Sequence, residues 1–301
     1  MSLHMLLGPE AATALLTRWP DSPFMLDLPD TSPIVRVINA QTVRGFLDAG
    51  CAPSSYVNVF HKGEGLHPAR FTADDRVAPA SVPLLLDQGC TIQLRELNRW
   101  HPPLSAICAG IQAETGCPGY VTAFITPPAA QGLDYHWDQY LGIVVQLEGS
   151  KTWELFRPKA DAPHRDHAMS TNLWQDEWVH QWQQAGPDLT VELTAGNVLV
   201  LPRGWVHNPH ARNATETSVH LTFVLKERSP LWVAERLIGS AINDPRFRAI
   251  ITPADLAAER LPETVKDVRA LMLDYLDHLD LDELARALRH ATEKETSHAT
   301  L

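Results

Sequence analysis

The chain has 301 residues, of which 45% are hydrophobic and 20% are charged, a composition typical of globular proteins that excludes a disordered chain. The 36 acidic and 25 basic side chains give a formal net charge of −11, which repels the phosphate backbone of nucleic acid. We therefore expect no direct nucleic-acid binding. The length allows one large domain with a smaller appendage.

The four cysteines are scattered and form no CxxC pair, which argues against a zinc knuckle and against a disulfide framework. No run approaches the roughly 18 apolar residues that are needed to cross a bilayer. The N-terminal segment lacks the basic flank and the cleavage site of a secretion signal. These features predict a cytoplasmic protein with reduced thiols and no membrane association.

The predicted elements begin with helices and continue as short strands. Apolar residues recur at helical spacing from Pro9 to Trp19 and from Ala40 to Leu47, and His101–Gly116 predicts one further helix. Strand patterns separated by Pro and Gly turns occupy residues 56–60, 91–94, 119–126, 141–147, 152–156, 190–193, 198–201 and 218–224. Many short strands of this kind indicate a β-barrel or sandwich with flanking helices.

From Ser229 onward the pattern becomes helical. Apolar residues of the segment 265–279, among them Leu271, Met272, Tyr275 and Leu276, recur at three- and four-residue steps and predict one apolar helix face. We therefore place a domain boundary near Ser229, between a mostly β domain at residues 1–228 and a helical region at residues 229–301. Residues 292–301 are polar and uncapped, which predicts a disordered tail.

Three residues have the types and the placement of a metal site. His136 and Asp138 are two residues apart just before a predicted strand, so in an extended chain their side chains project to one face. His207 follows the predicted strand 198–201 and a Pro-Arg-Gly turn, which can deliver it to the same mouth of a barrel. Two histidines and one carboxylate suit a non-haem Fe(II) that activates O2. Zinc in a hydrolytic site is the rival ion.

A second HxD pair, His164 and Asp166, lies in a charged, Pro-rich segment without a strand pattern, and we expect it to be structurally idle. His61, His67, His101 and His210 have no partner at ligand spacing and are expected at the surface or as helix caps. His220 lies inside a predicted strand, where it either packs in the core or projects towards the metal.

Lys151 is the residue that separates an oxygenase from other metal enzymes. It follows an apolar strand and a Glu-Gly-Ser turn and opens the next predicted strand. In a 2-oxoglutarate-dependent enzyme, the distal carboxylate of the co-substrate needs a fixed cation deep in the barrel. On position alone, however, a solvated lysine in a hairpin is the favoured interpretation.

Three blocks of the sequence resemble the JmjC proteins of the ribosomal-oxygenase type, including their bacterial cupin-like members. They read YVTAFITPPAAQGLDYHWDQYLGIVVQLEGSKTWELF at residues 120–156, GNVLVLPRGWVHNPHA at 196–211 and SVHLTF at 218–223. An HxD pair, a lysine fifteen residues after its histidine, a LEGxKxW hairpin, a PRGWxH turn and an SxHLT strand occur in order. The resemblance spans roughly residues 90–225.

This resemblance implies a double-stranded β-helix, the JmjC or cupin barrel, followed by a C-terminal helical region. It implies Fe(II) bound by His136, Asp138 and His207, with 2-oxoglutarate and O2 as co-substrates and Lys151 on the distal carboxylate of 2-oxoglutarate. It further implies an aliphatic C–H of a polypeptide side chain, for instance in a ribosomal protein, as the target. The region after Ser229 is similar to the helices through which many members form homodimers.

The chain departs from the family near the co-substrate. Where the family carries Asn-x-Tyr, this sequence has Thr122-Ala123-Phe124, and where the family has a serine near the end of the SxHLT strand, it has Val224. We expect Thr122 to keep one hydrogen bond at the co-substrate, and we place His220 in the same pocket. These departures bear on the substrate more than on the reaction.

Alternatives remain open at this point. A free amino acid, a small peptide or a natural-product intermediate could replace a polypeptide acceptor, and a metal-binding cupin could be catalytically idle. A zinc hydrolase is disfavoured because no general base stands in a motif such as HExxH. The net charge favours cationic acceptors. The aromatic and acidic segment 172–178, predicted as a loop, either lines a groove for them or is an insert packed by its tryptophans.

Overall fold

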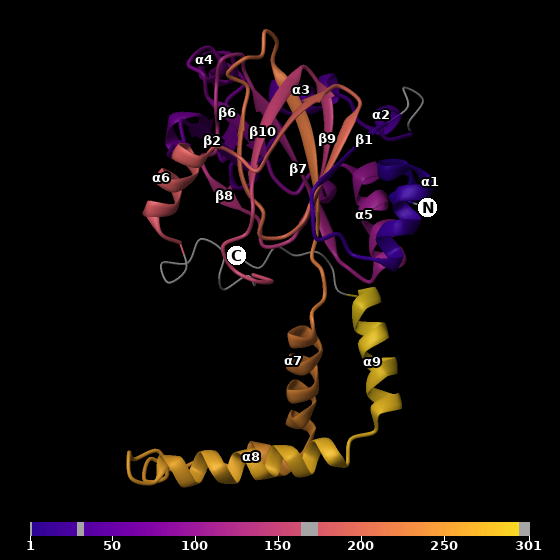
Figure 1. The fold of residues 1–301 in the computed structure, drawn as a ribbon, viewed down its shortest axis with the longest axis vertical. Coiled ribbons are helices and arrows are strands. Elements are labelled where there is room, and N and C mark those ends of the chain that lie inside the picture. The colour runs from indigo at the N-terminus through magenta and orange to yellow at the C-terminus, as the bar shows by residue number, and fades with distance from the viewer. Residues whose placement is uncertain (1, 29–32, 164–173, 295–301) are drawn as a thin grey trace. The chain divides into compact units, whose positions relative to one another are not determined.

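The computed structural model describes residues 2–28, 33–163 and 174–294 (Figure 1). The chain divides into two compact units, of which the first ends at Lys226 and the second begins at Glu227, close to the boundary predicted at Ser229. The predicted pair His164 and Asp166 lies outside the described residues. Among the described helices, none combines the length and the apolar character that crossing a membrane requires.

The first unit is built on two antiparallel sheets. The larger has the strand order β1-β12-β9-β14-β7-β6-β2-β3, and the smaller has the order β11-β10-β13-β8. The strands of the larger sheet are β1 Phe24–Asp27, β2 Val57–His61, β3 Glu64–Gly65, β6 Thr91–Leu94, β7 Gly119–Thr126, β9 Leu141–Glu148, β12 Asn197–Leu201 and β14 Ser218–Leu225. Those of the smaller sheet are β8 His136–Trp137, β10 Ser150–Phe156, β11 Leu189–Thr194 and β13 Val206–His210.

From β8 to β14 the chain passes back and forth between the two sheets, which makes the barrel a double-stranded β-helix, as predicted. A separate small hairpin joins β4 Thr72–Ala73 to β5 Arg76–Val77. The central strand β14 is buried at every position because it is covered on both faces. One face of β7, β9 and β14 belongs to the main hydrophobic core, and the alternate residues line a cavity between the sheets.

Helices cover the outer face of the larger sheet. Figure 1 shows α1 and α5 side by side next to the barrel. Leu3 and Leu6 of α1 and Leu104 and Ile111 of α5 are buried in the same core as the sheet residues. The helices of this unit are α1 Ser2–Thr17, α2 Pro33–Val37, α3 Ala40–Asp48, α4 Ser81–Asp87, α5 Pro102–Thr115 and α6 Asp176–Ala185.

The prediction of a loop at residues 172–178 is wrong from Asp176 onward, where α6 begins, and residues 172 and 173 lie outside the described residues. Asp176 and Glu177 occupy the first helical turn, where carboxylates interact favourably with the helix dipole. Trp178 and Trp182 then pack with Phe156 on the outer face of the smaller sheet. The tertiary contacts of these tryptophans stabilise the helix, and the local sequence does not predict them.

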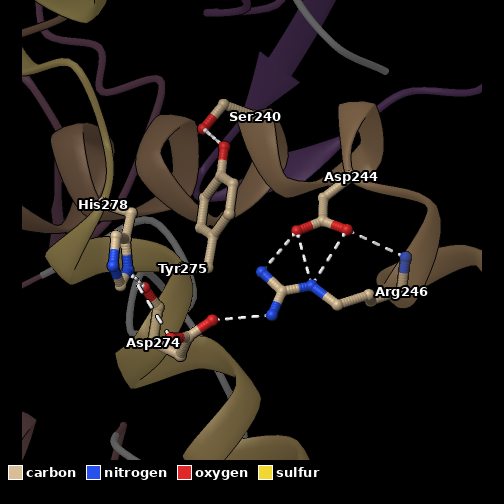
Figure 2. Close-up of polar contacts among 6 residues, drawn as sticks. All are labelled: Ser240, Asp244, Arg246, Asp274, Tyr275 and His278. Carbon is tan, nitrogen blue, oxygen red and sulfur yellow. Dashed lines mark hydrogen bonds and ion pairs between the residues drawn. The ribbon is translucent and has the colours of Figure 1, made fainter.

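The second unit contains α7 Pro230–Ser240, α8 Leu261–Asp277 and α9 Leu281–Lys294. Figure 2 shows its polar contacts: Arg246 forms ion pairs with Asp244 at 2.7 Å and Asp274 at 2.6 Å, and the Tyr275 and Ser240 hydroxyl oxygens lie 2.8 Å apart. The disordered tail predicted from residue 292 is wrong up to Lys294, which ends α9, and its remainder lies outside the described residues.

A tight hairpin between β9 and β10 determines where Lys151 enters the barrel. Gly149 has a φ of +62°, and a Cβ atom there would lie 2.4 Å from the Thr217 carbonyl oxygen. Gly116, which ends α5, has a φ of +69° but open space around its Cα. The two glycines therefore share the left-handed backbone and differ in the close approach to a neighbouring strand.

We expect Gly149→Ala to destabilise the protein more than Gly116→Ala. Both substitutions meet the cost of a left-handed alanine, about 1–2 kcal/mol, and only Gly149→Ala adds an overpacking cost of about 1–3 kcal/mol. Denaturant unfolding of the two variants measures the difference. Equal losses in the free energy of unfolding would mean that the hairpin relaxes freely and does not fix the position of Lys151.

Candidate metal and co-substrate site

The structure brings His136, Asp138 and His207 together at one end of the barrel. The antiparallel pairing of β13 with β8 places His207 directly opposite His136. Their ring centroids lie 4.1 Å apart, and the His207 Nε2 atom lies 3.7 Å from an Asp138 carboxylate oxygen. One donor atom from each side chain falls within 4.8 Å of the others, which is the spacing of ligands around a single metal ion.

Backbone carbonyl groups hold both imidazole rings with the same nitrogen facing away from the cluster. The Nδ1 atom of His136 lies 2.6 Å from the Asp134 carbonyl oxygen, and that of His207 lies 3.0 Å from the Trp205 carbonyl oxygen. Because a carbonyl oxygen only accepts, each Nδ1 must carry the proton, which leaves each Nε2 lone pair free for a metal. Burial, followed by the neighbouring His136, lowers the pKa of His207 to about 4, so this ring is neutral at pH 7.

A polar network lies behind the two histidines, on the outer face of the smaller sheet. The Asn208 amide donates to Glu154 at 2.7 Å and accepts from Gln131, whose own side chain also donates to the Leu133 carbonyl oxygen at 3.1 Å. Asn208 adjoins His207, and Gln131 lies on the segment that leads to His136. The network therefore ties the strand that carries one histidine to the segment that carries the other.

Lys151 extends into the barrel interior and is buried, with only 3% of its surface exposed. Its Nζ atom donates a hydrogen bond to the Thr126 hydroxyl at 3.0 Å and lies 5.8 Å from the centroid of the Phe124 ring. In the described part of the chain no carboxylate forms an ion pair with it. Burial without an anionic partner lowers the pKa of Lys151 to about 7. The alternative of a solvated hairpin lysine is therefore wrong.

His136, Asp138, His207 and Lys151 all line one cavity of about 170 Å³. Thr122 and His220, the other two predicted pocket residues, also line it, as do Phe124 and Val224. Phe124 stacks on His220 with their centroids 4.8 Å apart. The family's phenol position is thus filled by an apolar ring that covers His220, and the ammonium of Lys151 is left with the Thr126 hydroxyl as its neutral partner.

Buried polar atoms in this cavity lack partners among the described residues. They are the His220 Nδ1 atom and the Trp153 Nε1 atom. Trp153 lies between the two histidine rings, 5.6 Å by centroid from both His207 and His220. Buried polar groups usually have hydrogen-bond partners. Unpartnered groups next to an ammonium without a counter-ion therefore indicate a cavity that binds an anionic ligand.

Sequence reasoning missed several cavity residues that a two-residue period could have found. Trp153 lines the cavity on the same face of β10 as Lys151, and Thr126, which accepts the hydrogen bond of Lys151, lies on the same face of β7 as Thr122 and Phe124. Arg95 and Tyr120, at the other end of the cavity, were also missed. They too could be found from the two-residue alternation of cavity-facing side chains, which runs along β7 and along β6 and the residue after it.

Other sequence predictions have mixed outcomes. His67 caps a short helical turn, accepting from the Ala69 amide at 3.2 Å, as expected of a cap residue. The prediction that His210 is a surface or cap residue is wrong, because it is buried with its Nε2 atom 3.7 Å from Glu154. Trp178 and Trp182 line the outer face of the sheet and are not among the residues that line the cavity.

The donor set fits a mononuclear iron site. Two imidazoles and one carboxylate would hold Fe(II) and leave coordination positions for a chelating co-substrate and O2. The buried lysine in the same cavity provides the matching cation for a dianion that reaches from the metal into the barrel. A site for metal alone would not require that cation.

Comparison with known proteins places these features in a family. Residues 95–229 match the model of the JmjC domain. The chain is 26% identical over 246 residues to the bifunctional lysine-specific demethylase and histidyl-hydroxylase NO66 of Drosophila persimilis, covering 81% of this chain and 34% of that protein. It is 28% identical over 204 residues to human ribosomal oxygenase 1, covering 68% of this chain and 28% of that protein.

Solved structures agree with the fold. Escherichia coli YcfD superimposes with a TM-score of 0.57 at 15% identity, covering 95% of this chain and 72% of that one. YcfD in complex with cobalt and 2-oxoglutarate gives a TM-score of 0.56 at 16% identity, with 95% and 71% covered. The chain spans about a third of the length of the curated relatives it matches. Residues 95–229 thus match the JmjC domain, and most of the chain is similar in sequence to the ribosomal oxygenases.

Proposed function

We propose that the protein is an Fe(II)- and 2-oxoglutarate-dependent dioxygenase that hydroxylates an aliphatic C–H of a polypeptide side chain. The observation that carries this proposal is the buried ammonium of Lys151 in the cavity of the His136, Asp138 and His207 cluster. A zinc hydrolase or an idle metal-binding cupin has no use for a buried cation, whose desolvation costs stability.

The residues have distinct roles in this proposal. His136, Asp138 and His207 would hold the metal, and Lys151 with Thr126 would bind the distal carboxylate of 2-oxoglutarate. When bound, the two cofactors supply O2 activation coupled to the oxidative decarboxylation of 2-oxoglutarate to succinate and CO2. Thr122, His220 and Trp153 line the space between the metal end and Lys151, where they would orient the co-substrate and exclude water.

A polypeptide acceptor is supported by the relatives and by charge. The similar proteins are a bifunctional lysine-specific demethylase and histidyl-hydroxylase and the ribosomal oxygenases. The net charge of −11 attracts basic segments such as those of ribosomal proteins. The alternative acceptor is a free amino acid, a small peptide or a natural-product intermediate, which the changes at Thr122, Phe124 and Val224 would accommodate.

The protein should form succinate from 2-oxoglutarate with Fe(II) and should add 16 daltons to basic ribosomal peptides, as measured by mass spectrometry. His136→Ala, Asp138→Ala and His207→Ala should each abolish both reactions and weaken metal binding, because each removes one of three ligands. His180→Ala, at an exposed position of α6, is the matched control. Retained turnover in the His136→Ala variant would rule out the assigned centre. Hydroxylation of a small metabolite instead of the peptides would select the alternative acceptor.

Lys151→Met should raise the dissociation constant of 2-oxoglutarate at least about a hundredfold, because a buried carboxylate would lose its cation. Metal affinity should stay within about threefold of wild type, since Lys151 is not a ligand. Lys159→Met removes an exposed lysine and serves as the control. Calorimetric titration of the metal-loaded protein measures both quantities. An unchanged affinity for 2-oxoglutarate would transfer the role to another cation.

The same residue predicts a pH dependence. The pKa of Lys151 is about 7 in the folded protein and about 10.4 in the unfolded chain, so the unfolded state binds the extra proton between these values. The stability of the ligand-free protein should therefore rise from pH 7 towards pH 10 relative to that of Lys151→Met. Because the dianion needs the protonated lysine, 2-oxoglutarate should bind more weakly as the pH rises above 7. A flat profile in wild type would contradict both expectations.

We also propose that the second unit joins two chains into a homodimer. Leu271 and Tyr275 of the predicted apolar face are half-buried within this unit, whereas Ile242 and Val265 are 62% and 59% exposed. Ile238 and Val268 add to this exposed apolar surface. Apolar surface of this kind on neighbouring helical segments is typical of an interface between subunits.

The Val265→Asp/Val268→Asp double variant should shift the protein from dimer to monomer, because two carboxylates would be buried at the interface. Ala270→Asp, at an exposed position on another face of α8, should leave the dimer intact. Light scattering at micromolar concentration measures the mass. A wild-type monomer at this concentration would contradict the proposed interface.

A further inference from the structure

At the end of the cavity remote from Lys151, one positively charged side chain has no counter-ion among the described residues. Its charged lining residues are Arg95, Lys151, Glu96 and Asp138. Asp138 belongs to the metal cluster, and a carboxylate oxygen of Glu96 lies 3.2 Å from the Nε atom of Arg99, outside the lining. Lys151 is assigned to 2-oxoglutarate. Arg95 is left over, because in the described ranges its guanidinium makes no ion pair or hydrogen bond.

Tyr120 provides a second unused donor at the same end. It lines the cavity, and its hydroxyl forms no hydrogen bond with any residue that the structure describes. Burial raises the pKa of Tyr120, the charge of Asp138 raises it further, and the charge of Arg95 opposes both effects. The phenol is therefore neutral, keeps its proton for donation and lies within electrostatic range of both groups.

The ring of Tyr120 is held in place from outside. The Lys226 ammonium lies 5.7 Å from the centroid of the Tyr120 ring and 5.9 Å from that of Tyr140. The backbone of Arg95 is likewise fixed, because its amide donates to the Tyr56 carbonyl oxygen at 2.7 Å. The Tyr120 ring and the Arg95 backbone are thus both held in place.

This end is too far from Lys151 for one molecule of 2-oxoglutarate to use both. Tyr120 and Thr126, the hydrogen-bond partner of Lys151, are six residues apart on β7, which corresponds to about 20 Å along an extended strand. A five-carbon diacid whose distal carboxylate binds at Lys151 therefore cannot present that carboxylate to Tyr120. Arg95 and Tyr120 are left as donors for an oxygen other than that distal carboxylate.

We propose that Arg95 and Tyr120 form an oxygen-binding subsite that holds a carbonyl or carboxylate oxygen of the acceptor beside the metal. A guanidinium and a phenol are both donors, so the ligand atom they share must be an acceptor of hydrogen bonds, and a negative charge on it strengthens the contact. The inference rests on the proposed oxygenase function and specifies what the acceptor must present. Its oxygen comes from a main-chain amide of a polypeptide or from the α-carboxylate of a free amino acid.

The subsite can be tested before any acceptor is known. Full-length protein is loaded with Mn(II) and the unreactive 2-oxoglutarate analogue N-oxalylglycine, and the NMR signals of acetate and of N-methylacetamide are followed. A probe held beside the metal is broadened by the unpaired electrons of Mn(II). Saturation transfer from the protein to the same probes, measured without metal, is a second readout that does not need the metal site.

In wild type we expect broadening and saturation transfer for at least one probe. Arg95→Met should raise the dissociation constant of acetate about tenfold or more, and Tyr120→Phe should raise it by a smaller factor, because the lost hydrogen bonds are charge-assisted and neutral respectively. Arg36→Met, at an exposed position of α2, should have no effect. The affinities for Mn(II) and N-oxalylglycine should be unchanged in all three variants.

The outcomes separate the two proposals. Binding of both probes assigns a carbonyl oxygen and favours a polypeptide, whereas binding of acetate alone assigns a carboxylate. Probes that do not bind, binding that survives both Arg95→Met and Tyr120→Phe, or weaker N-oxalylglycine binding in Arg95→Met would each overturn the subsite. Loss of Mn(II) binding in wild type with Arg95-dependent saturation transfer intact would refute the oxygenase proposal and leave the subsite standing.

Discussion

The pairing of three strands in the smaller sheet is the constraint on which the site depends. Strand β13 pairs with β8 on one side and with β10 on the other, which places His207 between His136 and Leu155. A one-residue slip in either register would turn a histidine or Lys151 to the outer face. The polar network of Glu154, Asn208 and Gln131 lies on that outer face and fastens the same strands, so the register that forms the metal cluster is also the one that satisfies these groups.

The cavity has a positively charged side chain at each end, Lys151 at one and Arg95 at the other. Asp138 of the candidate metal site lies within electrostatic range of Tyr120, at the Arg95 end. Lys151 lies deep in the barrel with the Thr126 hydroxyl as its neutral partner, and Arg95 lies at the other end, within electrostatic range of Tyr120. A buried ammonium without a carboxylate costs stability, and a protein retains such a cost where a ligand compensates it. Burial of Lys151 therefore lowers the stability of the ligand-free first unit and favours the binding of an anion in the cavity.

Departures from the ribosomal-oxygenase pattern are concentrated on the cavity face of β7 and β14. Phe124 covers His220 where the family carries a phenol, and Val224 pairs with Tyr120 across the two strands. The phenol of Tyr120 lies four residues before Phe124 on the same face, at the end nearer to Asp138. On this strand the phenol therefore lies nearer to Asp138 in this chain than in the family pattern.

The sequence by itself determined the barrel, most of its strands and the identity of the metal cluster. Two-residue periodicity and the HxD spacing are local patterns, so they can be recognised in the sequence without knowledge of tertiary packing. The tertiary structure decided what depends on neighbours: the α6 helix, the burial of His210, and the strands β8 and β13, which are too short or too polar to announce themselves. It also decided the burial of Lys151, because position in a hairpin does not fix burial, and only the closed barrel removes that ammonium from water.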